Sequence, residues 1–262
     1  MTISQLALSL APTPTPSVSP THGGARAGAG RKRMKEAERK VVPHRARPVH
    51  RARHPLHVTL RARAGLPSFR EQAIHSEMVD AIAGASRSPA VGSAFRVIHF
   101  SVQSNHVHLV VEANDKSALS RGMLGLNVRL ARAVNRVLGA RGRVWRERYH
   151  GRALETPREV RNALVYVLMN VKKHSPRFVG IDYCSSAIWF DGFAGSPHGP
   201  APPGTAATPV VAANLVSASR NATVEKLVAE SRPVVEARTW LASTGWRKRG
   251  LLRIDERPRA RR

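Results

Sequence analysis

Two hydrophobic patterns, one of period two and one of helical period, divide the middle of the chain into predicted strands and helices. His57-Val58-Thr59-Leu60-Arg61 alternates between polar and apolar positions, as a strand with one buried face does. By the same reasoning we expect three further strands, at residues 95–102, 106–113 and 152–154. Apolar residues at helical spacing predict three helices, at residues 70–85, 117–138 and 156–174.

The helix that begins after Thr156 has the clearest start signal. Thr156-Pro157-Arg158-Glu159 forms a capping box with proline at the first helical position, and Pro176 marks the end. Lys172, Lys173 and His174 suit the negative end of the helix dipole. The predicted buried stripe of this helix consists of Val160, Leu164, Val167 and Val171.

The element order is strand, helix, strand, strand, helix, strand, helix. The first six elements match the ferredoxin-like βαββαβ arrangement. We therefore expect an α+β domain in which helices cover one face of an antiparallel sheet. The capped helix, which carries Tyr166, follows this core, and the opposite face of the sheet is expected to be open.

Composition changes at both ends of this pattern. Residues 1–42 are rich in Thr, Pro, Gly and Ala and then in Arg and Lys, and they are predicted to be a disordered basic arm. Residues 43–176 form the predicted domain. Residues 177–262 are read as a linker and a basic tail, with a short helix near Trp240.

The charge of the chain indicates a polyanionic partner. Of the 262 residues, 43 are Lys or Arg and 17 are Asp or Glu, which gives a formal charge of +26. This excess favours nucleic acid, and the duller alternative is a basic or ribosome-associated protein. The candidate DNA contacts are Arg45, Arg47, Arg51, Arg53, Arg129, Arg132, Arg136, Arg146, Arg148, Lys172 and Lys173.

Two further observations bear on the compartment. Cys184 is the single cysteine, so neither an intrachain disulfide nor a cysteine-based zinc site can form. No run approaches the roughly 20 apolar residues of a membrane span, and the first residues lack the basic region of a signal peptide. We expect a cytoplasmic, nucleoid-associated protein without membrane contact.

His106-Val107-His108 lies within one of the predicted strands. Residues two apart on a strand project from the same face, so His106 and His108 point together, and Val107, Leu109 and Val111 point to the core. Two imidazoles held side by side on a rigid strand are half of a metal site.

Tyr166 and Asn170 are the candidates for a nucleophile and for a third metal ligand. They are four residues apart on the capped helix and therefore lie on one helix face, one turn apart. A phenol can attack a phosphodiester when a metal ion polarises the phosphate, and an amide oxygen can be a third metal ligand. Tyr149 and Tyr183 are the rival nucleophiles, and Glu112 is a candidate partner behind the metal ligands.

This set of residues resembles the single-tyrosine HUH transposases, and most closely the REP-associated tyrosine transposases of bacteria. The resemblance covers residues 43–176 and implies a ferredoxin-like core, with His106, His108 and Asn170 as ligands of Mg²⁺ or Mn²⁺. It also implies that Tyr166 cleaves and joins single-stranded or hairpin DNA through a 5′-phosphotyrosine intermediate. Many members continue with His-Leu-Asn-Pro after the tyrosine, whereas this chain has Leu168-Met169-Asn170-Val171.

Two other interpretations use the same residues. A DNA-hairpin-binding protein of the same fold that no longer cleaves would keep the basic surface. Whether the protein cleaves DNA or only binds it, we expect a monomer or homodimer. A cupin barrel would use His106, His108 and Glu112 as a metal triad. Cupins have glycine where this chain has Phe100 and Leu119, and the predicted helix over 117–138 contradicts an all-β fold.

Overall fold

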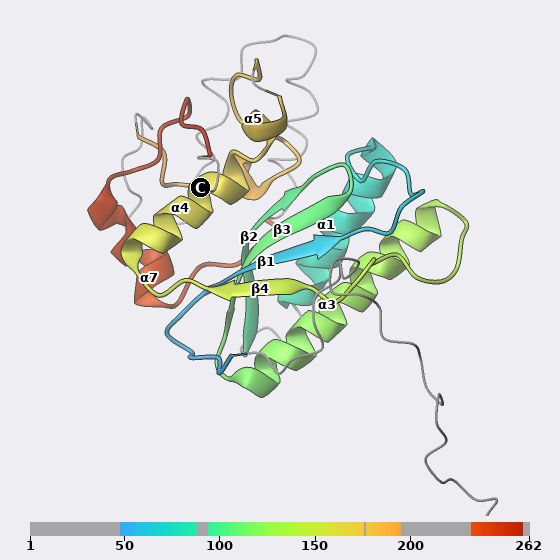
Figure 1. The fold of residues 1–262 in the computed structure, drawn as a ribbon, viewed down its shortest axis with the longest axis horizontal. Coiled ribbons are helices and arrows are strands. Elements are labelled where there is room, and N and C mark those ends of the chain that lie inside the picture. Colours follow the sequence, from blue (N-terminus) through green and yellow to red (C-terminus); the bar gives the residue numbers. More distant parts are fainter. Residues whose placement is uncertain (1–47, 88–93, 176, 195–231, 259–262) are drawn as a thin grey trace, which may run out of the picture. The chain divides into compact units, whose positions relative to one another are not determined.

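The computed structural model describes residues 48–87, 94–175, 177–194 and 232–258, and its centre is a four-stranded antiparallel sheet (Figure 1). The strand order is β2-β3-β1-β4. The strands are β1 (Leu56–Arg61), β2 (Phe95–Val102), β3 (His106–Ala113) and β4 (His150–Ala153). This order is that of the ferredoxin-like βαββαβ fold, which confirms the predicted α+β class.

One face of the sheet packs against α1 (Gln72–Arg87) and α3 (Lys116–Val137). Val107, Leu109 and Val111 of β3 project into this core, as their alternation predicts, and none of them is exposed. Helix α3 approaches the sheet closely at Gly122. The absence of a side chain permits this approach, since a Cβ atom there would overlap the ring of Phe95. This core contains aliphatic and aromatic side chains almost throughout.

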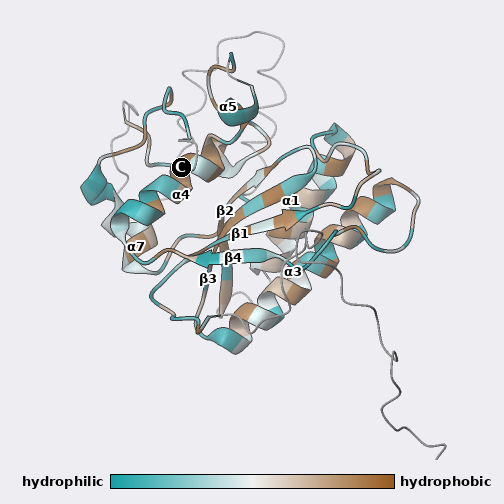
Figure 2. Ribbon diagram, in the orientation of Figure 1, coloured by the Kyte–Doolittle hydropathy of each residue, from teal (hydrophilic) through white to brown (hydrophobic). Residues whose placement is uncertain are grey.

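The other face of the sheet, expected to be open, is covered by α4 (Pro157–Leu168). Figure 2 shows hydrophobic and hydrophilic residues alternating along α4, and its buried stripe packs on Ile98 and Val110. The capping box is present, because Thr156 accepts from the Glu159 amide and Glu159 accepts from the Thr156 amide. The capping prediction is therefore confirmed, but the histidine face of the sheet is not open.

The residues after 176 that the structure describes complete this second core. They include the 3-10 helices η2 (Ser186–Trp189) and η4 (Gly245–Arg249) and the short helix α7 (Trp240–Ser243). Trp246 is fully buried against Phe190, whose ring also contacts Phe193. The sequence places these residues in a linker and tail, whereas residues 232–258 pack onto α4.

Two carboxylates, the fully buried Glu112 and the half-buried Glu256, hold residues 232–258 in place. Glu112 accepts hydrogen bonds from Arg96 Nε, from the backbone amides of Arg238 and Thr239, and from the Thr239 hydroxyl, at 2.8–3.1 Å. Arg161 of α4 forms a two-pronged ion pair with Glu256, at 2.7 and 2.9 Å. Both anchors join residues more than 90 positions apart, which local sequence patterns do not reveal.

The predicted helix over 156–174 is interrupted. Helix α4 ends at Leu168, Met169 departs from helical geometry with φ −108° and ψ 18°, and α5 (Val171–His174) follows. The side chain of Asn170 donates from Nδ2 to the carbonyl of Tyr166 at 3.2 Å. The amide side chain thus satisfies a carbonyl that the broken helix leaves unpaired.

Several expectations fall on residues that the structure does not describe. The basic arm over 1–42, Arg45, Arg47 and most of the predicted linker lie outside the described residues. Within the described part of the chain, no helix has the length and apolar character needed to cross a membrane.

Candidate active site

A polar row crosses β1 and β3 on the sheet face that α4 covers. The antiparallel register places Arg61 opposite His106 and Thr59 opposite His108, and it places His57 opposite Val110. Side chains directly opposite each other in an antiparallel pair share one face, with Cβ atoms about 5 Å apart. The register therefore assembles His57, Thr59, His106 and His108 on one small area of the sheet.

Both histidines of the His106-Val107-His108 stretch have a hydrogen-bond partner on Nδ1. His106 Nδ1 lies 2.8 Å from Asn105 Oδ1. His108 Nδ1 lies 3.1 Å from Thr59 Oγ1 and 3.2 Å from His57 Nε2. When Nδ1 carries the proton, Nε2 keeps its lone pair, which is the form in which a histidine binds a metal ion.

Burial keeps both imidazoles neutral. Burial, and then repulsion by His57, His106, Lys173 and His174, lowers the pKa of His108 to about 2. Burial also lowers the pKa of His106 to about 4, with smaller contributions from His174, Arg61 and Lys173. The two histidines are therefore neutral at physiological pH, and neutral imidazole is the ligand form.

Tyr166 projects from α4 toward the histidines. Its half-buried ring lies edge-on to the His108 ring, with centroids 5.0 Å apart, and 5.5 Å from the His57 ring. Lys173 Nζ donates to the Tyr166 hydroxyl at 3.2 Å. An ammonium group at this distance stabilises negative charge on the phenol oxygen, which favours its use as a nucleophile.

Asn170 is fully buried, and among the described residues its Oδ1 has no hydrogen-bond partner. His108 Nε2 is likewise buried without a partner in this part of the chain. By donor chemistry, an amide oxygen and an imidazole nitrogen that each lack a partner could both be ligands of a divalent cation such as Mn²⁺ or Mg²⁺. Among the described residues, no three His, Cys, Asp or Glu side chains gather into a metal-binding cluster by themselves.

Other residues singled out from the sequence lie elsewhere. The Glu112 carboxylate is fully buried and accepts from Arg96, Arg238 and Thr239, so the structure does not bring it to the histidines. Tyr149 is buried in the core that contains α1 and α3. The Tyr183 ring contacts His75 and Arg70. Neither rival tyrosine is brought to the polar row that contains His106 and His108.

The candidate DNA contacts divide between the two sides of the sheet. Arg129, Arg132 and Arg136 are exposed on α3, on the side opposite Tyr166, and Arg136 pairs with Glu77 at 2.7 Å. Arg132 and Arg136 line a shallow cavity of about 470 Å³ at the end of α3. Arg51, Arg53 and Arg148 are exposed, and Arg146 is half-buried.

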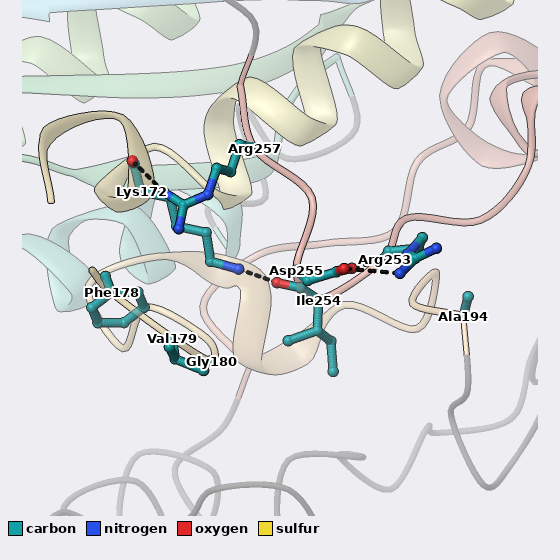
Figure 3. A pocket seen from close by; sticks show the side chains of 9 residues that line it. All are labelled: Lys172, Phe178, Val179, Gly180, Ala194, Arg253, Ile254, Asp255 and Arg257. Carbon is teal, nitrogen blue, oxygen red and sulfur yellow. Dashed lines mark hydrogen bonds and ion pairs between the residues drawn. The ribbon is translucent and has the colours of Figure 1, made fainter. Parts of the chain in front are cut away.

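Lys172 and Lys173 are neighbours in sequence but differ in environment. Lys173 is exposed beside Tyr166, whereas Lys172 is buried and its ammonium group donates to the carbonyl of Ile254. Figure 3 shows Lys172 on the wall of a cavity that Phe178, Val179, Arg253 and Arg257 also line. The volume of this cavity is about 580 Å³. The ammonium group of Lys172 is therefore bound to the protein backbone.

Sequence reasoning missed four residues of the site. His57, Thr59 and Arg61 belong to β1, and His174, whose ring lies 6.0 Å from that of His106, belongs to α5. The alternation of β1 places His57, Thr59 and Arg61 on its polar face. Only the pairing of β1 with β3 shows that this face carries the histidines.

Residues 63–167 match the family model described as transposase IS200 like. A solved structure of a REP-associated tyrosine transposase bound to a REP hairpin is 16% identical, with 51% of this chain and 75% of that chain covered and a TM-score of 0.38. No curated protein matched. The matched segment, residues 63–167, includes His106, His108 and Tyr166, and over this segment the chain is similar to the IS200-like transposase family.

Proposed function

We propose that this domain cleaves and rejoins single-stranded DNA, at hairpin-forming sequences, through a covalent link to Tyr166. The observation that carries the proposal is the position of the Tyr166 ring, 5.0 Å from the ring of His108, with its hydroxyl 3.2 Å from Lys173 Nζ. The phenol can act as the nucleophile, the ammonium group can stabilise its negative charge, and neutral imidazoles can hold a metal ion that polarises the phosphate.

In the proposed step the Tyr166 oxygen attacks a DNA phosphorus atom, and the bond from that phosphorus to the 3′-oxygen breaks. The proton of the phenol is lost to solvent, and the departing oxygen takes up a proton to become a 3′-hydroxyl. The DNA 5′-phosphate stays on Tyr166 as a phosphodiester, so its energy is conserved for rejoining. Lys173 stabilises the phenol oxygen as negative charge develops on it.

His106, His108 and Asn170 are the proposed ligands of Mg²⁺ or Mn²⁺. Bound there, the ion would polarise the phosphate and stabilise the departing oxygen. Two neutral imidazoles and a neutral amide add no negative charge beside the DNA phosphate. The unpartnered, buried Nε2 of His108 and Oδ1 of Asn170 support this assignment.

Positive charge around the tyrosine supports a DNA substrate. Arg61 lies opposite His106 on the exposed end of the polar row, and Lys173 is exposed beside Tyr166. The chain as a whole carries a formal charge of +26. We expect binding to weaken steeply with salt, by about 0.7 in log K per log salt unit for each phosphate neutralised in a single strand.

The test is a denaturing gel of labelled hairpin oligonucleotide incubated with protein and Mn²⁺. Wild-type protein should form a covalent adduct, and Tyr166→Phe should form none while binding the hairpin with nearly unchanged affinity. Tyr183→Phe is the matched control, because Tyr183 lies away from the polar row that contains His106 and His108. This variant should behave as wild type. An adduct in Tyr166→Phe would overturn the assignment of the nucleophile.

A wild-type protein that binds the hairpin and forms no adduct would favour the other interpretation. The domain would then be a DNA-hairpin-binding protein that keeps the fold and the charge without cleaving.

A further inference from the structure

One ring nitrogen of His108 lies near two partners on the neighbouring strand. His108 Nδ1 is 3.1 Å from Thr59 Oγ1 and 3.2 Å from His57 Nε2. Both partners belong to β1, and Thr59 is directly opposite His108 in the antiparallel register. The contact is therefore fixed by the sheet itself and not by a mobile loop.

The other ring nitrogen determines which tautomer suits this site. His108 Nε2 is buried and has no partner among the described residues. If Nε2 carried the proton, a buried donor would remain without an acceptor, and no lone pair would be available to a cation. If Nδ1 carries the proton, that proton is donated to β1, and the lone pair of Nε2 is left for a cation.

His57 also contacts the tyrosine. Its ring lies 5.2 Å from the ring of His108 and 5.5 Å from the ring of Tyr166. A histidine that accepts on Nε2 carries its own proton on Nδ1, so the contact with His108 also fixes the tautomer of His57. One side chain of β1 thus packs against both the candidate ligand and the candidate nucleophile.

We infer that Thr59 and His57 are positioning residues, which accept the Nδ1 proton of His108 and hold its Nε2 ready for a metal ion. The inference rests on the proposed metal-binding role of His108. Neither residue needs to touch DNA or the ion. Their effect passes through the orientation and the protonated nitrogen of one imidazole, as is usual for partners behind a metal-ligating histidine.

The first test needs no variant and no metal. In protein labelled with ¹⁵N-histidine, long-range ¹H–¹⁵N spectra at neutral pH distinguish the two neutral tautomers of each histidine. The resonance of His108 is assigned by its loss in His108→Ala. We expect the Nδ1–H tautomer, and a His108 held mainly as Nε2–H would overturn the inference.

The second test removes and restores the acceptors. Thr59→Val with His57→Phe takes away both, and we expect the Nε2–H tautomer to gain population and Mn²⁺ affinity, measured by calorimetry, to fall by about ten-fold or more. Thr59→Ser with His57→Gln keeps an acceptor at each position and should retain the wild-type tautomer and affinity. Thr59→Val alone, which preserves side-chain shape, should give a smaller change of the same sign.

These readouts separate the inference from the proposed function. If wild-type protein binds Mn²⁺ and the variants shift the tautomer as expected, but no DNA adduct forms, then the cleavage proposal fails and the positioning role stands. If adducts form while the acceptor-free variant keeps the wild-type tautomer and Mn²⁺ affinity, then the positioning role fails and the cleavage proposal stands.

Discussion

The two faces of the same sheet are built from different chemistry. Toward α1 and α3, strand β3 presents Val107, Leu109 and Val111, and the core there is almost wholly hydrocarbon. Toward α4, the same strand presents His106, His108 and Glu112, the last two of which are buried. Because side chains alternate along a strand, one eight-residue segment supplies both a stable core and a polar site.

The polar face needs more support than the apolar one. Buried polar groups are stable only when their hydrogen bonds are satisfied. Glu112 is satisfied by Arg96 and by the backbone of Arg238 and Thr239, so residues 232–258 complete the face. In contrast to Glu112, His108 Nε2 and Asn170 Oδ1 have no hydrogen-bond partner within the described part of the chain.

The largest expected effect is the loss of cleavage on removing either histidine. His106→Ala and His108→Ala should each eliminate metal-dependent cleavage, because each removes a proposed ligand of the ion. Cleavage of labelled hairpin DNA across a Mn²⁺ titration measures this. Wild-type activity in both variants would contradict the metal-site proposal.

The neighbouring residue on β3 provides the matched control. Leu109→Ala should lower the free energy of unfolding by about 2–5 kcal/mol, since it leaves a cavity in the apolar core. Below its unfolding transition, this variant should keep the Mn²⁺ dependence of the wild type. If Leu109→Ala loses the Mn²⁺ dependence of cleavage as His108→Ala does, then the stabilising role of one face and the metal-binding role of the other cannot be separated.

A large stability effect is expected at Glu112. Glu112→Gln should lower the free energy of unfolding by about 2–4 kcal/mol, because it places an amide among donors that require a carboxylate. Urea unfolding measures the change, and proteolysis between residues 232 and 258 should become faster. Asp255→Asn, which alters an exposed ion pair with Arg253, should leave both measurements unchanged. Unchanged stability in Glu112→Gln would mean that residues 232–258 are held by other contacts.

Some of this arrangement was predictable from the sequence, and the limits have physical causes. Strand alternation placed His106 and His108 on one face, and helical spacing placed Asn170 one turn after Tyr166. The roles of His57 and Thr59 depend on the register between β1 and β3, which no local pattern specifies. The helix break at Met169 lies within an apolar run that reads as continuous helix. The packing of residues 232–258 on α4 depends on contacts across a long intervening segment.

A smaller effect is expected at Asn170. Asn170→Ala should weaken Mn²⁺ binding at least about ten-fold and impair cleavage without erasing it, and higher Mn²⁺ should partly restore the rate. Asn170→Asp should tighten metal binding and weaken DNA binding, because it adds a negative charge beside the phosphate. If Asn170→Ala shows an unchanged rate and unchanged Mn²⁺ dependence, then the third ligand lies elsewhere, and Asn170 serves only the Tyr166 carbonyl.

A further effect on stability concerns pH and two histidines outside the site, and it is the smallest when counted per pH unit. Burial lowers the pKa of His75 to about 4 and that of His99 to about 3. Well above pH 6.5 both histidines are neutral in the folded and in the unfolded chain, so the free energy of unfolding has its full value. As the pH falls below 6.5 the unfolded chain takes up protons first, and stability should decrease by up to about 1.4 kcal/mol per pH unit for each histidine.

Urea unfolding at a series of pH values measures this slope. The decrease should continue until the pH reaches about 4 for His75 and about 3 for His99. His99→Gln should remove the contribution of one histidine from the slope. A slope that is the same in His99→Gln and wild type would contradict the assignment of His99 as a buried, neutral group.

The most direct test of the central claim is to identify the residue that carries DNA. Protein trapped with a hairpin oligonucleotide and Mn²⁺ is digested with protease and nuclease, and the peptide bearing the nucleotide is sequenced by mass spectrometry. If Tyr166 beside His108 is the nucleophile, the nucleotide should be attached to Tyr166, within the peptide from α4. A nucleotide on Tyr149, in the apolar core, or on Tyr183 would contradict the account.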